Sequence, residues 1–405
     1  MYFSFGFYSS ILLIFFVHGF VYAILLWRKG MINETASDKW LSTFLFLSIL
    51  YIAPWMLGFG GWYDKQPYRD ILFYTPFQHL YFIGPVIFFY VQSLLNPSFR
   101  FGRSTMWHLL PGILYLLFTV IMVVTDKLVL NDYFFLANGA DPDFDTWYQL
   151  TGFISMLFYF LLSIRYYNLY KNLIVQTVSY ADSVLFSWIK KFLLAFLIML
   201  CIRFVFFIIE QFTELWYADT WWYFLTFAIL FYYIAISGYA NSVETKVAFK
   251  PNMMDSRPAL LLNYPQENIW EEDAEVIEIE PTEKEQAASD EVLNEWKPKL
   301  LRLLQVEKLY ENPELTLTEV AKQLQKSPSF ISMIVNRGFA QNFNDLINQF
   351  RIEAVKQKLN KGEHKYQTLL GIAYDCGFNS KATFNRAFKK ATGQNPKTYI
   401  SGIKG

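Results

Sequence analysis

Long apolar stretches recur along the first 240 residues of the chain. A helix that crosses the hydrocarbon core of a bilayer needs about 20 mostly apolar residues. Seven stretches meet this requirement: Phe5–Trp27, Trp40–Phe59, Ile71–Leu95, Trp107–Thr125, Trp147–Ser163, Trp188–Ile209 and Trp221–Tyr239. Several begin or end with Trp, which is enriched at membrane–water interfaces. The pattern predicts a seven-helix transmembrane bundle.

The last 110 residues follow a different pattern, in which short amphipathic helices alternate with turns. After a first helix over Asp290–Tyr310, a short helix over Leu317–Leu324 precedes Ser327, a residue type that caps helices. Pro328 then suits the first helical position, and the next helix is expected over Ser329–Asn336. A short helix, a tight turn and a second helix form the arrangement that docks in the major groove of DNA.

The same order recurs after a longer helix, which is expected over Asn342–Asn360. Leu369–Cys376 is predicted as a short helix, Gly377 turns the chain, and a final helix covers Lys381–Thr392 before Gly393 ends it. Two such units joined by one helix predict a double helix-turn-helix DNA-binding domain. The predicted fold class is therefore all-α, a seven-helix transmembrane bundle followed by this domain.

Composition supports a membrane part. The 405 residues are 54% hydrophobic, 20% aromatic and only 17% charged, whereas a soluble domain carries roughly 25% charged residues. A buried helical bundle in a soluble protein is the alternative, but seven apolar runs would leave it too little polar surface. The two cysteines, Cys201 and Cys376, are far apart and predict neither a disulfide nor a cysteine metal site.

Charge divides the chain into three parts. Residues 1–250 hold 15 basic and 14 acidic residues, residues 251–295 hold 2 and 13, and residues 296–405 hold 18 and 8. We therefore predict three regions: a transmembrane sensor module over residues 1–246, an acidic flexible linker over residues 247–290 and the DNA-binding domain over residues 291–405. The acidic linker is either a solvated spacer or a competitor of DNA for the basic domain.

Basic residues between the predicted spans indicate the orientation of the membrane module. Eleven Lys and Arg residues follow spans one, three, five and seven, while the opposite side holds three basic and nine acidic residues. Cytoplasmic connections are enriched in Lys and Arg. With seven spans, the N-terminus is expected outside and the C-terminal domain in the cytoplasm. The predicted location is the inner (cytoplasmic) membrane, as a multi-pass protein.

Polar residues within the apolar stretches mark a candidate ligand site. His18 lies in the first predicted span, His79 in the third, and Arg203, Glu210 and Gln211 in the sixth. Charge inside a bilayer is costly and often functional. These residues either line an outward-facing cavity for a small polar ligand, or they form structural ion pairs and hydrogen bonds between helices.

Several motifs near the C-terminus carry a family resemblance. They are Ile372–Ser380, Phe384–Lys390 and Thr392–Pro396, and Val320-Ala321 and Phe350–Ala354 fit the same pattern. Over about the last 100 residues, the chain resembles the DNA-binding domain of the AraC/XylS family of bacterial transcription regulators. The resemblance implies a double helix-turn-helix that binds double-stranded DNA.

The resemblance also implies which side chains meet base edges: Ser329, Ser332 and Met333 in the first unit, and Lys381, Ala382, Asn385 and Arg386 in the second. Arg and Lys suit guanine and Asn suits adenine, so the chemistry supports the second set better. Lys389 and Lys390 are expected to contact phosphates. Val335-Asn336 departs from the family's usual aromatic-basic pair, which suggests weaker backbone contacts by the first unit.

The chain contains no HExxH, GxSxG or Walker motif, so we expect no enzyme activity, no cofactor and no metal. The predicted function is a membrane-bound one-component transcription regulator that couples an external or membrane cue to sequence-specific DNA binding. Expected partners are double-stranded DNA, the lipid bilayer and an unknown small-molecule ligand, with RNA polymerase and a second copy of the chain as further candidates. The alternative is a multi-span transporter or channel with a regulatory DNA-binding tail.

Overall fold

The computed structural model describes residues 5–137, 139, 141–181, 187–213, 216–240, 249–250, 259–261, 276–278 and 290–403. The chain divides into two compact units. The apolar unit comprises Met1–Tyr166 and Ser187–Glu244, and the C-terminal unit comprises Tyr167–Phe186 and Thr245–Gly405. Tyr167–Phe186, which the sequence placed in the membrane module, therefore belongs to the C-terminal unit.

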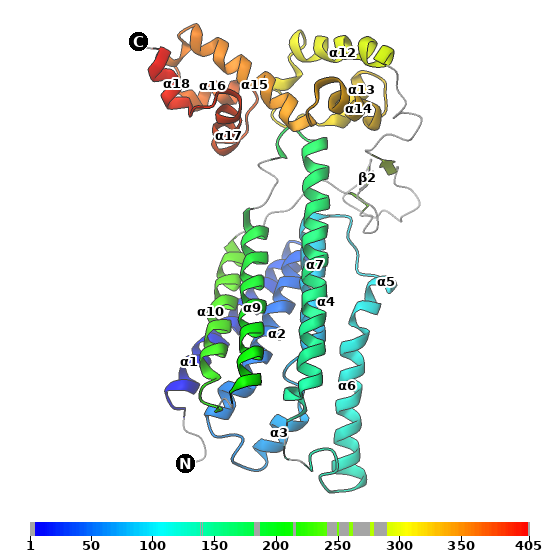
Figure 1. Cartoon of the computed structure of the whole chain (residues 1–405), viewed down its shortest axis with the longest axis vertical. Helices are drawn as coiled ribbons and strands as arrows, with labels where there is room; N and C mark the ends of the chain where they lie inside the picture. The colour runs from blue at the N-terminus through cyan, green and yellow to red at the C-terminus, as the bar shows by residue number, and fades with distance from the viewer. Residues whose placement is uncertain are drawn as a thin grey trace. The chain divides into compact units, whose positions relative to one another are not determined.

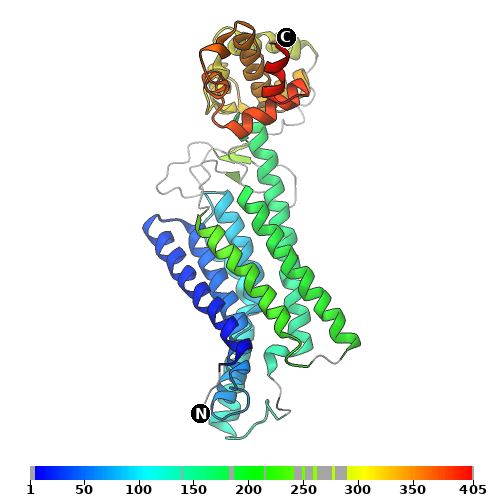
Figure 2. The ribbon, with the colours of Figure 1, turned by 90° about the vertical axis from the view of Figure 1, so that its left-hand side faces the viewer.

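Helices make up almost all of the described structure, which confirms the all-α fold class. Figures 1 and 2 show the helices of the apolar unit packed side by side. In chain order they are α1 (Phe7–Ile32), α2 (Ala36–Phe59), α3 (Tyr68–Tyr74), α4 (Leu80–Leu95), α5 (Arg103–Met106), η1 (Trp107–Leu109), α6 (Leu110–Val123), η2 (Val124–Val129), η3 (Pro142–Phe144), α7 (Thr146–Thr177), α9 (Ser187–Phe212) and α10 (Trp221–Ala240).

The structure corrects the predicted number of full-length spans from seven to six. Six described helical stretches are long and apolar enough to cross a membrane: Phe7–Ile32, Ala36–Phe59, Arg103–Val129, Thr146–Thr177, Trp188–Glu210 and Trp221–Ala240. The third predicted span, Ile71–Leu95, is instead divided into α3 and α4. With 16 residues, α4 rises only about 24 Å, less than the roughly 30 Å of the hydrocarbon core.

Proline and a carboxylate explain this break. Pro76 has no N–H and disfavours a helical conformation at the preceding residue, and Thr75 is indeed extended, with ψ at 117°. The Asp143 carboxylate accepts hydrogen bonds from the backbone N–H groups of Phe77 (2.8 Å) and Gln78 (2.9 Å). A side chain from a distant loop thus satisfies donors near the start of α4.

The short helix α4 is buried among its neighbours. Gly84 of α4 faces α7, where a Cβ atom in its place would lie 2.8 Å from the Tyr159 ring. Tyr90 accepts a hydrogen bond from the indole Nε1 of Trp188 at the start of α9 (2.6 Å), and α2 and α6 also pack against α4. Small residues allow such close helix contacts. Protein rather than lipid therefore surrounds most of α4.

The helix ends of the apolar unit meet at two faces. At the first, Lys29 Nζ donates a hydrogen bond to the carbonyl of Tyr239 (2.8 Å), so that α1 and α10 end together. At the second, Trp221 Nε1 donates to the carbonyl of Tyr8 (3.1 Å), so that α10 and α1 begin together. We call these the Lys29 face and the Trp221 face.

Helix α4 runs from the Trp221 face to the Lys29 face. The backbone N–H of Leu80 donates to the Tyr148 hydroxyl at the start of α7 (3.2 Å). Near the other end of α4, Tyr90 bonds to Trp188, which lies beside Gly238 at the end of α10. The helix therefore connects the same two faces as its longer neighbours.

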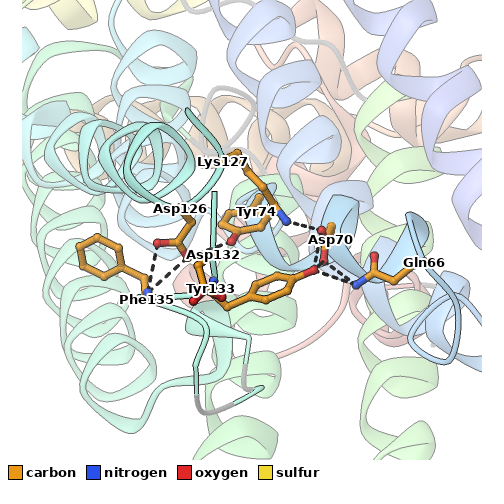
Figure 3. A network of polar contacts seen from close by, with 8 residues as sticks. All are labelled: Gln66, Asp70, Tyr74, Asp126, Lys127, Asp132, Tyr133 and Phe135. Carbon is orange, nitrogen blue, oxygen red and sulfur yellow. Dashed lines mark hydrogen bonds and ion pairs between the residues drawn. The ribbon is translucent and has the colours of Figure 1, made fainter. Parts of the chain in front are cut away.

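A polar network joins α3 to the end of the α6–η2 stretch (Figure 3). Lys127 Nζ lies 2.5 Å from the Asp70 carboxylate and 4.2 Å from the ring centroid of Tyr133. The Tyr133 hydroxyl also donates to Asp70, and the Tyr74 hydroxyl donates to Asp126 (2.9 Å). A single exposed ion pair would contribute little, but this network holds α3 against the loop that follows η2.

Besides the last part of α7, the C-terminal unit holds nine helices among the residues described: α12 (Asp290–Gln305), η4 (Leu309–Glu311), α13 (Leu317–Gln323), α14 (Pro328–Phe339), α15 (Phe343–Asn360), η5 (Glu363–Lys365), α16 (Leu369–Asp375), α17 (Lys381–Thr392) and α18 (Pro396–Ile403). It also contains three short strands, β1 (Phe249–Lys250), β2 (Ala259–Leu261) and β3 (Val276–Glu278). They form an antiparallel sheet in the order β1-β2-β3. Most of the predicted acidic linker lies outside the described residues.

Two hydrophobic cores flank α15. Its first half contributes Phe343 and Ile347 to a core with α12, α13 and α14. Its second half contributes Val355 and Leu359 to a core with α16 and α17. The helix thus belongs to both helix-turn-helix units, as the sequence predicts, and fixes how they are joined.

Local contacts confirm the predicted start of α14 and both predicted ends of α17, whereas α12 ends at Gln305 rather than Tyr310 and α14 continues to Phe339 rather than Asn336. The Ser327 side chain accepts a hydrogen bond from the N–H of Phe330 (3.2 Å), and Pro328 occupies the first turn of α14. Ser380 caps α17 in the same way. Gly393 ends α17 in the left-handed conformation, with φ at 73°.

Candidate nucleic-acid interface and cavity

Helix α17 presents one exposed polar face and one buried apolar face. Thr383, Phe384 and Phe388 are buried in the second core. The predicted base-contacting residues of this unit all lie on the exposed face: Lys381, Ala382, Asn385 and Arg386. Asparagine and arginine at adjacent exposed positions of a helix can contact adenine and guanine edges in the major groove. The geometry suits direct base readout by α17.

Basic side chains extend this face toward the end of α17. Lys389 and Lys390 are exposed, and Lys390 Nζ lies 2.8 Å from the Asp345 carboxylate of α15. Partial burial lowers the pKa of Arg386 from its ordinary value. Lysines at this position can contact phosphates, which position a helix without reading sequence. Lys390 would have to leave Asp345 to do so.

The predicted contact residues of the first unit occupy a different environment. Met333 is 1% exposed and belongs to the first core. Ser329 and Ser332 are also buried, and the Ser332 hydroxyl accepts a hydrogen bond from Asn336 Nδ2 (3.3 Å). Helices α12, α13 and α15 and strand β3 all contact α14. The side chains of these three predicted contacts are therefore buried, unlike those of α17.

A glycine and a buried arginine set the turn before α17. Gly377 has φ at 91°, and a Cβ atom in its place would lie 2.2 Å from the carbonyl oxygen of Tyr310. Only glycine fits this left-handed, crowded position. The Arg351 guanidinium lies over the ring of the next residue, Phe378, 5.8 Å from its centroid. The motif Phe350–Ala354 contains Arg351, but no role for this residue follows from the motif alone. A charged residue beside the apolar positions of this helix was the signal that could have pointed to it.

Two adjoining cavities of the apolar unit lie near the Trp221 face, lined by residues that the structure describes. The larger, about 580 Å³, is lined by aromatic residues, by Asp64 and Asp141, and by Arg69. The smaller, about 240 Å³, is lined by Arg203, Glu210, Gln149 and further aromatic residues. Trp55 and Phe144 line both. The two cavities therefore adjoin, with both signs of charge in an aromatic setting.

Buried polar groups in these cavities have specific partners. Arg203 donates to the Gln149 side chain (3.0 Å) and lies 3.4 Å from the Glu210 carboxylate. Burial and the neighbouring Asp143 carboxylate raise the pKa of Asp141. Among the described residues, nothing accepts a hydrogen bond from the buried indole N–H of Trp55. A buried donor without an acceptor is unfavourable, so this indole is a strained point of the packing beside the cavities.

The structure brings together only part of the predicted ligand cluster. Arg203 and Glu210 line one cavity, with Gln149 as an unforeseen partner. His18 instead contacts the rings of Tyr22 and Tyr232. His79 stands just before α4 against Phe82, outside both cavity linings. The side chain of Gln211, the fifth predicted residue, is outside the described part of the structure.

Comparisons with known proteins concern the C-terminal unit. Residues 320–402 match a family model described as a helix-turn-helix domain, of the AraC type. An uncharacterized HTH-type transcriptional regulator of Staphylococcus aureus (strain COL) is 33% identical over 91 residues, which are 22% of this chain and 12% of that protein. The uncharacterized HTH-type transcriptional regulator YijO of Escherichia coli (strain K12) is 32% identical over 85 residues, 21% of this chain and 29% of YijO.

The matched part is thus one domain of this chain and less than a third of either relative. No solved structure matches the chain. Residues 320–402 form an AraC-type helix-turn-helix domain, as the resemblance implied. Such a domain implies binding to DNA and a part in transcription regulation.

Proposed function

We propose that this protein is a membrane-bound one-component transcription regulator, which senses a cue with its apolar unit and binds specific DNA sequences with its C-terminal domain. One observation carries the proposal: a single chain joins six helices long enough to cross a membrane to an AraC-type helix-turn-helix domain. No catalysis or metal is needed for this function. Binding energy alone would couple the two activities.

The proposed orientation places the Lys29 face in the cytoplasm. Basic residues gather at the helix ends of this face, as expected for a cytoplasmic side: Arg28, Lys29, Lys39, Arg100, Arg103, Lys190 and Lys191. Because α4 connects both faces, the six long helices and α4 together cross an odd number of times. The N-terminus would then lie outside the inner membrane and the DNA-binding domain inside the cell.

The cue would bind at the Trp221 face, which this orientation directs outward. The cavities there are lined by Arg203 as a donor and by Asp141 and Glu210 as acceptors, with Trp55 between them. Aromatic rings with a few convergent polar groups are typical of small-molecule sites. A small polar ligand with a hydrogen-bond acceptor fits this chemistry.

Genome-wide mapping of DNA bound by the full-length protein in its own host would test DNA recognition. We expect discrete bound sites for the natural chain. Joint replacement of Asn385→Ala and Arg386→Ala should remove them, because these side chains lie on the exposed face of α17. Lys299→Ala, which removes an exposed charge of α12 paired with Glu295, is the control. A map that the double replacement leaves unchanged would contradict the proposal.

Replacement of Arg203→Leu would test the sensing cavity. The change removes the contacts with Gln149 and Glu210, and we expect altered transcription from the mapped sites with normal membrane insertion. Ser163→Ala, in a buried helix position away from the cavity linings, is the control. Normal insertion with unchanged transcription would exclude a role of Arg203 in sensing.

A further inference from the structure

The end of α7 packs into the C-terminal unit. Directly after the helix, Val178 forms an antiparallel bridge with Thr316, and the N–H of Ser179 donates to the carbonyl of Leu315 (3.0 Å). Val178, Ser179 and Ala181 are at most 2% exposed. Val178 and Ser179, at the start of the connection between α7 and α9, are thus held by the backbone just before α13. We call Val178–Ala181 the docking segment.

Arg351 of α15 completes this contact. Its guanidinium donates to the Ser179 carbonyl (3.0 Å) and to the Ser179 hydroxyl (2.9 Å). It also donates to the carbonyls of Tyr310 (2.9 Å) and Asn312 (2.7 Å). One arginine therefore joins the docking segment to η4 and α15 within the C-terminal unit.

Arg351 is a buried cation and depends on the hydrogen-bond acceptors that the docking segment supplies. The side chain is 1% exposed, and every acceptor that the described residues supply to it is neutral. Burial lowers the pKa of Arg351 to about 10, which leaves it charged at neutral pH. A buried cation needs all its hydrogen bonds. Loss of Ser179 would remove two acceptors and favour a rearrangement around Arg351.

The same arginine reaches the turn that positions α17. Its guanidinium lies over the Phe378 ring, and its Nε would lie 3.0 Å from a Cβ atom at Gly377. Gly377 and Phe378 lie three and two residues before the Ser380 cap of α17. A change at the docking segment can therefore reach the DNA-reading helix through one side chain.

We propose that the site formed by Arg351 and Leu315-Thr316 is a receptor for the docking segment, and that this contact couples the apolar unit to DNA binding. The inference rests on the proposed function and deepens it. Helix α7 carries Gln149 in the cavity lining, and the docking segment follows its last residue. A cue that moves α7 changes the docking segment, and a docked segment holds α17 ready to bind DNA. By linkage, DNA binding favours docking in return.

Cross-linking tests the contact itself. Paired residues of antiparallel strands have Cα atoms about 4.5–5.5 Å apart, within the range of a disulfide. We would combine Val178→Cys and Thr316→Cys in the full-length chain, with Cys201→Ser and Cys376→Ala and a protease site inserted within residues 262–275. After oxidation in membranes and cleavage, we expect the two fragments to stay joined until reduction. The control chain carries Val178→Cys and Thr398→Cys. If the fragments of the test chain are joined no more often than those of the control, docking is overturned.

DNA affinity tests the coupling. Ser179 is fully buried, so Ser179→Leu should expel the docking segment. In membrane vesicles, with a DNA fragment from a mapped site as probe, we expect Ser179→Leu to weaken binding roughly 5-fold or more. Ser179→Ala removes only the hydroxyl acceptor and should act in the same direction. Ser163→Ala, the same substitution within α7, loses a hydrogen bond to Tyr159 and should leave the affinity unchanged.

The outcomes separate this inference from the proposed function. Specific DNA binding by the natural chain, with equal affinities for Ser179→Leu, Ser179→Ala and Ser163→Ala, would overturn the coupling role and leave the regulator standing. Absence of specific DNA binding by the natural chain would instead overturn the proposed function. If Ser179→Leu fails to accumulate in membranes, Ser179→Ala and the cross-linking comparison still decide.

Discussion

Three arginines of this chain differ in burial and therefore in what they can do. Arg386 is exposed on α17, where a guanidinium can meet a base edge. Arg351 is buried among neutral acceptors, and Arg203 is half-buried in the apolar unit beside Glu210 and Gln149. A charge removed from water needs fixed partners. Arg351 thus joins parts of the C-terminal unit, Arg203 lies in the cavity proposed to bind the cue, and Arg386 lies on the face predicted to read DNA.

Replacement of Arg386→Ala and of Lys389→Ala should have different effects on DNA binding. Loss of a base contact costs about 1–3 kcal/mol and relaxes specificity at one base pair. Loss of a phosphate contact weakens binding to all sequences and reduces the salt slope by about 1. Fluorescence anisotropy at several salt concentrations, with a mapped fragment and its single-base variants, measures both. The same loss at every base variant for Arg386→Ala would argue against base reading.

Replacement of Gly377→Ala should destabilise the C-terminal unit strongly. The new Cβ atom would meet the Tyr310 carbonyl oxygen at 2.2 Å, at a φ of 91°. Gly393→Ala is a matched control, because its φ is 73° but no atom lies within 4 Å of the added Cβ. Left-handed strain alone costs about 1–2 kcal/mol. Chemical unfolding should show a clearly larger loss for Gly377→Ala, and equal losses would contradict the clash.

At the scale of elements, local signals predicted the structure better than distant contacts did. The ends of α14 and α17 follow from Ser327, Ser380 and Gly393, whose effects act within a few residues. The division of Ile71–Leu95 depends on Asp143, which is far along the chain. Hydropathy detects the apolar run Ile71–Leu95, but it carries no information about a carboxylate elsewhere in the chain. The six long helices were therefore predictable, and the short buried α4 was not.

The candidate site divides in the same way. The exposed face of α17 follows from its amphipathic pattern, so its predicted residues lie where expected. The burial of Ser329, Ser332 and Met333 depends on packing from other elements, such as the helices that form the first core with Met333. Family resemblance supplies residue roles but not the contacts of this particular chain. Whether those residues meet DNA stays a prediction.

Removal of the β3 contact should strengthen DNA binding by the first unit. Strand β3 contacts α14, the helix that carries the predicted contacts of that unit. Replacing residues 276–278 with Gly-Ser-Gly should disrupt the pairing of β3 with β2, since glycine weakens strands. We expect tighter binding of the full-length protein to a mapped fragment. Replacing residues 249–250 of β1, which pairs only with β2 in the described sheet, is the control. Equal affinities for both variants would show that β3 does not limit access.

At the scale of the whole molecule, the division into units falls within α7 rather than only in the acidic region. Tyr166 ends one part of the apolar unit, and Tyr167 begins the part of α7 that belongs with the C-terminal domain. If a single long linker were the only connection, a cue could act only by changing how freely the DNA-binding domain moves or how it pairs with a second copy. A helix shared by two units adds a direct route, on which the proposed docking segment depends.

The crossing by α4 decides on which sides of the membrane the two ends of the chain lie. Six crossings would put both ends on one side, whereas six long helices and α4 put them on opposite sides. Single-cysteine labelling with a membrane-impermeant maleimide tests this, in chains with Cys201→Ser and Cys376→Ala. The positions of Lys65→Cys and Asp132→Cys lie beyond the helix ends near the Trp221 face. The position of Gly102→Cys follows α4, and no atom lies within 4 Å of a Cβ atom placed there.

We expect Lys65→Cys and Asp132→Cys to be labelled in right-side-out vesicles, and Gly102→Cys only in inverted ones. The physical reason is that α4 is surrounded by α2, α6, α7 and α9, so it need not match the full thickness of the lipid to cross. Labelling of Lys65→Cys and Gly102→Cys from the same side, with Asp132→Cys labelled from the other, would mean that α4 turns back within the membrane while Arg103–Val129 still crosses it. The cavity near the Trp221 face and the DNA-binding domain would then have to lie on one side, and the proposed outward sensing would fail.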